Sequence, residues 1–339
     1  MTRIVPSSVA RNAGFEQTPP DPIAIPREEW RRGDFVVAEV LASGSVPYFI
    51  ETPSGRMAEL APGDLIVGAF GRRAATLEIV GDWREVDDSV MQVLVPGGVL
   101  GRCTSAAATR QPMADVRYLG HAHIDGNRQS LGSGAWVADR RLEAPIVLLI
   151  GTSMDAGKTV AGRAIVRQLK RAGARVAGIK VTGVGRYKDI LALHDAGADF
   201  IADFVDAGLP STVVPAEDFR VALRRLCALV ADSEPDVVVA EAGASPLEPY
   251  NGDEAVRELG ERVKLVVLCA SDPYAVAGVM SAFGLKPDLV SGRATSTSAG
   301  IELIERLVGV PSMNLLEPAE SHRLSELLTG ALGDLAVRS

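Results

Sequence analysis

Apolar and polar positions follow two different rhythms along the chain, and the change falls near residue 144. Before it, short apolar runs separated by Pro and Gly turns occur at 35–41, 47–51, 65–70 and 75–80. Short strands at this spacing are typical of a small β barrel or sandwich. We therefore predict a β-rich domain over residues 34–143, preceded by an extended N-terminal arm over residues 1–33, where prolines are frequent and periodicity is weak.

From residue 144 to 339, strand-like runs alternate with helical periodicity. The pattern predicts strands at 146–150, 175–180, 236–240 and 263–269, and helices at 157–172, 189–205, 217–232 and 253–261. In the first of these helices Val160, Ala164, Ile165 and Leu169 share one apolar face. Alternation of strands and helices predicts an α/β domain with a parallel sheet covered by helices.

A glycine loop between the strand at 146–150 and the following helix is the strongest chemical signal. It comprises Gly151, Thr152, Ser153, Met154, Asp155, Ala156, Gly157, Lys158, Thr159 and Val160. A phosphate-binding loop of the Walker A type requires this order, because its backbone N–H groups and the helix N-terminus face the anion. Lys158 would neutralise the β- and γ-phosphates, and the Thr159 hydroxyl would bind Mg²⁺. Five residues separate the two glycines, where the usual pattern has four, or else Thr152 occupies the position of the first glycine.

The ends of later strands supply further candidates, because ligands of parallel sheets bind outside the carboxyl ends of the strands. Glu241 ends one apolar strand and is expected to share Mg²⁺ with Thr159; the alternative is a carboxylate that caps a turn. Lys180 is expected to bind a phosphate or a substrate carboxylate, unless it is a solvated lysine. Asp189 is either a further metal ligand or a helix cap. We predict catalytic roles for Lys158, Lys180 and Glu241.

Composition narrows the functional classes. The net charge of −8 argues against nucleic acid and anionic membranes as partners, since both attract basic surfaces. No apolar run reaches the roughly 20 residues that span a bilayer, and the N-terminus lacks a secretory signal pattern. Three cysteines without a CxxC pair fit a reducing compartment. We therefore expect a cytoplasmic protein.

Two histidines two residues apart are the candidates for a metal pair outside this loop. His121 and His123 would share one face of a strand. A third ligand at metal-site spacing is missing from the sequence around them. The alternative is a pair of ordinary surface or hydrogen-bonded histidines.

Several of these segments together resemble dethiobiotin synthetase. The resemblance covers about residues 145–320 and rests on the loop from Gly151 to Val160, the lysine at position 180 after a second strand, and Glu241 before Ala242-Gly243. It implies a parallel-sheet P-loop fold that binds ATP and Mg²⁺ and phosphorylates a carbamate formed from CO₂ and a diamine. Lys180 would then meet the carbamate or the γ-phosphate. The β-rich N-terminal domain and the loop Thr182-Gly-Val-Gly-Arg-Tyr-Lys188 depart from that family.

We therefore expect a parallel-sheet P-loop NTPase domain preceded by a small β-rich domain. The expected function is a Mg-ATP-dependent ligase that activates a carboxylate or carbamate of a small metabolite by phosphoryl transfer, with a carboxylate or amine as substrate. Preference for ATP over GTP follows from the resemblance. Two alternatives stay open: a nucleotide-binding switch or ATPase that acts on a protein partner, and a transferase that modifies amino acids and uses the loop for a phosphate-bearing cofactor. A homodimer is also left open.

Overall fold

The computed structural model describes residues 3–41, 47–108, 113–132 and 140–333, and they divide into two compact units. Unit 1 comprises residues up to 136 together with 184–188 and 204–214. Unit 2 comprises 137–183, 189–203 and the chain from 215 onward. Within the described residues, no helix is long and apolar enough to cross a membrane.

Five strands of unit 1 close into a ring. They are β3 (Phe35–Val40), β6 (Leu65–Phe70), β9 (Val90–Val95), β10 (Val99–Ala106) and β11 (Asp115–Ile124). The pairing runs β6–β3–β11–β9–β10, and β10 then pairs with β6 in parallel. Alternate residues such as Val36, Ile66 and Met91 fill one core. The β-rich prediction is confirmed, and the closed ring makes it a barrel, not a sandwich.

Shorter elements extend this barrel. The strands β7 (Arg72–Ala74) and β8 (Ile79–Asp82) continue the sheet beyond β10, β12 (Asn127–Arg128) pairs with β11, and β4 (Tyr48–Glu51) forms a ribbon with β5 (Met57–Leu60). Three 3₁₀ turns are η1 (Ser8–Ala10), η2 (Arg27–Glu29) and η3 (Trp83–Glu85).

The predicted N-terminal arm differs from the structure, because residues 3–33 are built into unit 1. Strand β1 (Ile4–Pro6) pairs in parallel with β6, and β2 (Asp21–Ile23) pairs antiparallel with β11. Phe15 and Trp30 are buried. Three-residue strands leave no periodicity in a sequence, so only the barrel strands on which they pair reveal them.

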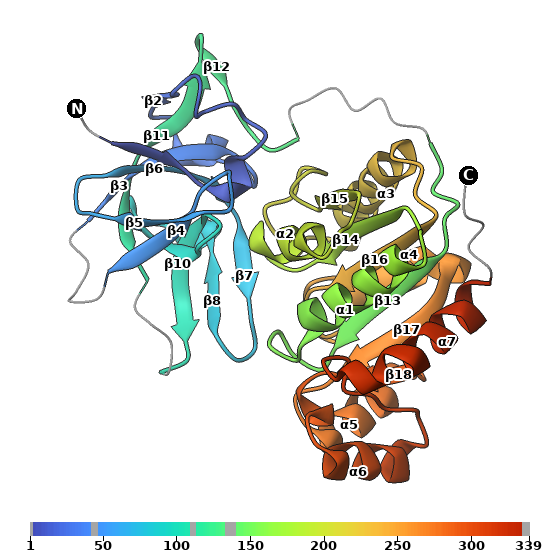
Figure 1. The fold of residues 1–339 in the computed structure, drawn as a ribbon. Coiled ribbons are helices and arrows are strands. Elements are labelled where there is room, and N and C mark those ends of the chain that lie inside the picture. The colour runs from blue at the N-terminus through green and yellow to red at the C-terminus, as the bar shows by residue number, and fades with distance from the viewer. Residues whose placement is uncertain (1–2, 42–46, 109–112, 133–139, 334–339) are drawn as a thin grey trace. The chain divides into compact units, whose positions relative to one another are not determined.

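Unit 2 contains the predicted parallel sheet, with strand order β15-β14-β16-β13-β17-β18 (Figure 1). The strands are β13 (Ile146–Gly151), β14 (Val176–Thr182), β15 (Phe200–Asp203), β16 (Val237–Ala242), β17 (Val263–Cys269) and β18 (Leu289–Ser291). The helices are α1 (Lys158–Arg171), α2 (Lys188–Asp195), α3 (Ala216–Asp232), α4 (Gly252–Leu259), α5 (Pro273–Phe283), α6 (Ser298–Val308) and α7 (Ser321–Leu332). Short 3₁₀ turns lie at η4 (Gly260–Arg262), η5 (Arg293–Thr295) and η6 (Pro318–Glu320).

Apolar side chains of one sheet face pack with helices α1 and α7 in a single core. Val147, Leu149 and Val239 of the sheet belong to it, together with Ile165 of α1 and Leu324 of α7. Helices α3 and α4 pack on each other, and both contact β14. Strand β13 lies inside the sheet between β16 and β17, so the loop that follows it has strand ends on both sides.

The helix predicted at 189–205 is wrong in its second half. Helix α2 ends at Asp195, and residues 200–203 form strand β15 beside β14. Gly197 has φ +107°, a left-handed conformation that ends the helix at little cost for glycine. The run after Gly197 is short, and its sheet neighbour, not local periodicity, makes it a strand.

Two segments of the C-terminal half, 184–188 and 204–214, belong to unit 1 and are called the docked segments below. The N–H of Gly185 donates to the Pro210 carbonyl at 2.9 Å, and Val184 forms a bridge with Ser211. A Cβ on Gly97 would lie 2.0 Å from the Gly185 carbonyl oxygen, so barrel and segment meet backbone to backbone. The domain limits at 33/34 and 143/144 stay a prediction. That prediction does not include the two later segments, 184–188 and 204–214, that belong to unit 1.

Candidate functional site

The glycine loop wraps around the side chain of Lys158. β13 ends at Gly151 and α1 begins at Lys158. The buried Lys158 ammonium donates to the carbonyl of Ser153 at 2.7 Å and to that of Met154 at 3.4 Å. A Cβ on Gly151 would lie 2.6 Å from this ammonium, and Gly157 has φ +103° at the N-cap of α1. Strand, glycine loop and helix therefore have the arrangement of a phosphate-binding loop.

The neighbouring strand ends hold this loop in place. The N–H of Thr152 donates to the Cys269 carbonyl at 3.0 Å, and the Thr152 hydroxyl accepts from the N–H of Ser271 at 3.0 Å. On the next strand, Gly292 has φ +94°, and a Cβ there would lie 2.2 Å from the Ala156 carbonyl oxygen. A loop held at both Thr152 and Ala156 keeps its N–H groups oriented before any ligand arrives.

Not every residue of the predicted loop turns its side chain toward the site. Asp155 and Val160 are exposed. Val160 was expected on the apolar face of α1, but 40% of it is exposed.

Thr159 and Glu241 are in contact. The Thr159 hydroxyl donates to a Glu241 carboxylate oxygen at 2.9 Å. The contact follows from sheet order, since β16 pairs directly with β13 and places Glu241 beside Leu149, near the start of the loop. Glu241 is buried, and the hydroxyl compensates part of the cost of burying its charge.

The buried Lys180 and the partly buried Asp189 form an ion pair next to that contact. Their side-chain nitrogen and oxygen lie 2.5 Å apart. In the sheet, Lys180 is paired with Glu241 on one side and Asp203 on the other. Three adjacent strand ends therefore bring these charges into one row at the carboxyl edge of the sheet. Asp189 is paired with Lys180, and none of the described contacts joins Asp189 to Thr159.

Burial and the neighbouring charges shift the pKa values of the residues in this row. Burial lowers the pKa of Lys158, although the Glu241 carboxylate opposes the shift. Burial raises the pKa of Glu241, and the nearby Asp189 carboxylate raises it further, against the opposing effect of Lys180 and Lys158. For Lys180 burial lowers the pKa, but Asp189 and Glu241 outweigh it and the net direction is upward. Lys180 therefore keeps its positive charge, and the Glu241 charge is costly without a cation.

The donor set suits Mg²⁺ delivered with a nucleotide. Across the described ranges, no group of three or more His, Cys, Asp or Glu side chains is placed to hold a metal ion. Mg²⁺ usually takes one or two protein oxygens and fills its remaining positions with waters and substrate phosphates. Thr159 and Glu241 offer such a hydroxyl and carboxylate in contact. Asp189 already pairs with Lys180, so it is the weaker of the predicted metal ligands.

The structure adds two residues that the sequence-based search did not assign to the site. A Cβ on Gly243 would lie 2.2 Å from the Thr182 carbonyl oxygen and 2.8 Å from the Lys180 side chain, so this glycine lets the strand end pack against the lysine. Asp203 is fully buried at the end of β15. A search of the carboxyl ends of strands would have included Asp203 if residues 200–203 had been predicted as a strand.

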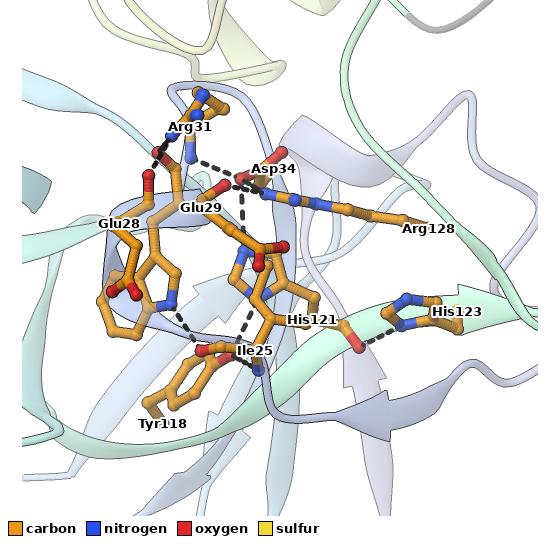
Figure 2. A network of polar contacts seen from close by, with 10 residues as sticks. Ile25, Glu28, Glu29, Arg31, Asp34, Tyr118, His121, His123 and Arg128 are labelled. Atoms are coloured by element: carbon orange, nitrogen blue, oxygen red, sulfur yellow. Dashed lines mark hydrogen bonds and ion pairs between the residues drawn. The ribbon is translucent and has the colours of Figure 1, made fainter.

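His121 and His123 do not form a metal site. His121 is fully buried, and both ring nitrogens are engaged: one lies 2.7 Å from the Tyr118 hydroxyl and the other 3.2 Å from the Asp34 carboxylate (Figure 2). A ring nitrogen of His123 lies 2.9 Å from the His121 carbonyl oxygen. Asp34 also accepts from Arg128, so the cluster fastens the segment before β3 onto β11.

No family model matches the chain, and a search of curated proteins finds no match. Solved structures with partial likeness include the signal recognition particle receptor FtsY from Elizabethkingia anophelis, at 15% identity over 55% of this chain and 65% of that one, with a TM-score of 0.37. A DUF1611 family protein from Anabaena variabilis is 13% identical over 59% and 63% of the two chains, with a TM-score of 0.40. The hydrogenase maturation factor HypB from Archaeoglobus fulgidus is 15% identical over 56% and 91%, with a TM-score of 0.39.

The chain spans less than two thirds of the length of the first two of these structures. Likeness at these identities and TM-scores carries no argument about function, and it gives no support to the dethiobiotin synthetase resemblance. The strand order and the loop geometry therefore carry the assignment of fold class, which is a parallel-sheet α/β P-loop domain preceded by a β barrel.

Proposed function

We propose that unit 2 binds a Mg-nucleoside triphosphate and transfers its γ-phosphoryl group to a carboxylate or carbamate of a small metabolite. One observation carries the proposal. Lys158, the Thr159–Glu241 contact and the Lys180–Asp189 pair lie at neighbouring strand ends beside a phosphate-binding loop, and Lys158, Lys180 and Glu241 are buried. Such a row provides positioning and charge neutralisation, on which phosphoryl transfer depends more than on a protein nucleophile.

Lys158 is the group that would bind the phosphates. Its ammonium bonds two carbonyls of its own loop, and these weak acceptors can be exchanged for phosphate oxygens. Bonds between an ammonium and a phosphate are charge-assisted and roughly twice as strong as neutral ones. The depressed pKa of Lys158 reflects burial without a full counter-charge, which a triphosphate supplies.

Thr159 and Glu241 would hold Mg²⁺, which would supply positive charge to neutralise the negative charge that develops on the phosphates during transfer. The raised pKa of Glu241 supports this role, because a buried carboxylate without a cation carries an uncompensated cost. Bound Mg²⁺ would compensate the charge of the Glu241 carboxylate.

Lys180 supports the choice of an anionic acceptor. Its charge is maintained by Asp189 and Glu241, and the strand-end position faces the ligand side of the sheet. In the transfer, an oxygen of the acceptor carboxylate forms a bond to the γ-phosphorus, the bond from that phosphorus to the bridging oxygen breaks, and the nucleoside diphosphate leaves with the electron pair. A carboxylate or carbamate carries no proton on the attacking oxygen, so the step needs no general base.

The test is nucleotide turnover by the purified chain with Mg-ATP or Mg-GTP, each combined with panels of carboxylic acids and of amines plus bicarbonate. We expect a metabolite to stimulate release of ADP, and we expect ATP to be preferred, which only the resemblance supports. Lys158→Ala should abolish turnover, whereas Lys264→Ala, the same change at an exposed lysine of β17, should not.

Undiminished turnover in Lys158→Ala would remove the loop from the active site. Turnover stimulated only by a protein partner would favour the switch alternative. A tightly retained phosphate-bearing cofactor without hydrolysis would favour the group-transfer alternative.

A further inference from the structure

Glu51 is a buried carboxylate of the barrel unit that lies far in sequence from the predicted site. It ends strand β4 and is fully buried. Its carboxylate accepts from the Ser8 hydroxyl at 2.6 Å, from the N–H of Tyr187 at 2.7 Å and from the N–H of Lys188 at 2.8 Å. Burying a charge requires such compensation, so these donors are the reason a carboxylate is tolerated here.

Two of the three donors belong to a docked segment and not to the barrel strands. Tyr187 and Lys188 are the end of segment 184–188, which unit 1 includes. The backbone of Glu51 is already fixed by its own N–H, which donates to the Pro96 carbonyl at 2.8 Å. The strand therefore does not need the carboxylate for its pairing, and the side chain serves the segment.

Other contacts within unit 1 hold the same segment. The guanidinium of Arg11 lies 4.7 Å from the centre of the Tyr187 ring, and it also pairs with Asp206 of the other docked segment at 2.7 Å. The Gly185 N–H is bonded to Pro210. The segment is thus anchored at several points, and Glu51 holds its last two residues.

Those last two residues lead directly into α2. Lys188 is the first residue of this helix and Asp189 the second. The first N–H groups of a helix have no partner within it, and a carboxylate next to them is favourable both as an acceptor and through the helix dipole. Glu51 therefore bonds the N–H of the residue at which α2 starts, one residue before the carboxylate that pairs with Lys180.

We propose that Glu51 is a positioning residue of the phosphoryl-transfer site: it holds the start of α2 so that Asp189 stays paired with Lys180. The proposal rests on the proposed function, because it assigns Glu51 an effect on the rate through Lys180. Glu51 itself does not touch the reacting groups.

Two independent substitutions remove the anchor. Glu51→Gln keeps the size of the side chain but places an amide N–H₂ where an acceptor is needed. Lys188→Pro removes one donor N–H from the other side, and proline is well accommodated at the first position of a helix. The matched controls are Lys188→Ala, which keeps the N–H, and Glu59→Gln, which makes the same change at an exposed glutamate of β5, the partner of β4.

With Mg-ATP and the stimulating metabolite, Glu51→Gln and Lys188→Pro should lower kcat by about tenfold or more, because small displacements of a catalytic group cost up to about 10²-fold. The KM for ATP should change by less than about threefold, since the Lys158 loop is untouched. Both controls should stay within about twofold of the wild type, as surface substitutions usually do. In hydrogen exchange, the amides of residues 187–190 should exchange faster in the two anchor variants.

A double variant separates positioning from a general loss of stability. If Glu51 acts through Asp189, then Glu51→Gln added to Asp189→Asn should lower kcat no further than Asp189→Asn alone. Multiplicative losses, or an unchanged kcat in both anchor variants, would overturn the proposal. If the wild type turns over no nucleotide, the proposed function fails by itself. The exchange measurement then still decides on the anchor: faster exchange confined to residues 187–190 supports it, and rates equal to wild type refute it.

Discussion

Replacing Thr159 by valine tests the centre of the predicted metal site. The change keeps the branched shape and removes only the hydroxyl that donates to Glu241 at 2.9 Å. Hydrogen bonds to charged groups contribute about 1.5–3 kcal/mol. Thr159 is partly exposed, so water replaces some of the loss and the lower end applies. We expect Thr159→Val to lower the free energy of unfolding by about 1.5 kcal/mol, which for a domain of this size corresponds to a Tm decrease of about 3–6 °C.

The same substitution should weaken the response to Mg²⁺. Thr159→Val removes one oxygen ligand, so the Mg²⁺ concentration for half-maximal turnover should rise, while Thr159→Ser should restore both the metal response and the Tm. The measurements are thermal unfolding without nucleotide and a Mg²⁺ titration of ADP release. Thr329→Val, the same change at an exposed threonine of α7, is the control.

A double-mutant cycle with Glu241→Gln isolates the contact itself. We expect a coupling free energy of about 1 kcal/mol or more between the two positions, as for residues that share a hydrogen bond. The reasoning is refuted if the coupling is near zero, or if Thr159→Val matches Thr329→Val in both Tm and Mg²⁺ response.

Three further predictions concern other parts of the chain. The pKa of Asp199 is raised by burial but lowered more strongly by its bonds from Lys170 and a backbone N–H, so its stabilisation is present above the unfolded pKa and is lost as the pH falls through the folded value. Asp199→Ala should therefore cost about 1 kcal/mol in urea unfolding at pH 7, discounted for exposure, and much less at pH 3; an equal loss at both pH values would contradict this. Asp34→Ala removes the shared acceptor of the cluster in Figure 2 and should destabilise unit 1 by about 3 kcal/mol in thermal unfolding. A loss below about 1 kcal/mol would refute the role of Asp34 in fastening the segment before β3 onto β11. Burial raises the pKa of Cys269 to about 12, so iodoacetamide at pH 8 should leave it unmodified in the folded protein, and mass spectrometry would reveal the opposite.

The parts that could be predicted from the sequence have local causes. The loop from Gly151 to Thr159 is legible because strand, glycines, lysine and helix follow one another without a gap. The parallel sheet was predicted from alternating apolar runs, and Lys180 and Glu241 were found because they stand at strand ends. Each of these features depends on residues a few positions apart.

The parts that could not be predicted depend on residues distant in the chain. The barrel closes because β10 returns to β6, and the N-terminal strands exist only because barrel strands pair with them. Asp203 was hidden in an expected helix, and β14 as a neighbour makes its segment a strand. A short apolar run without such a neighbour is compatible with either structure.

The sequence by itself therefore determined the P-loop, the fold class of unit 2, and Lys180 and Glu241 at the sheet edge. Only the tertiary structure decided that Glu51 bonds the start of α2, across 136 and 137 positions of sequence. The physical reason is that the periodicity of strands and helices and the conformation of a glycine loop depend on residues that are neighbours in the sequence. The partner of a buried carboxylate, in contrast, is chosen by packing, which brings together segments that share no local pattern.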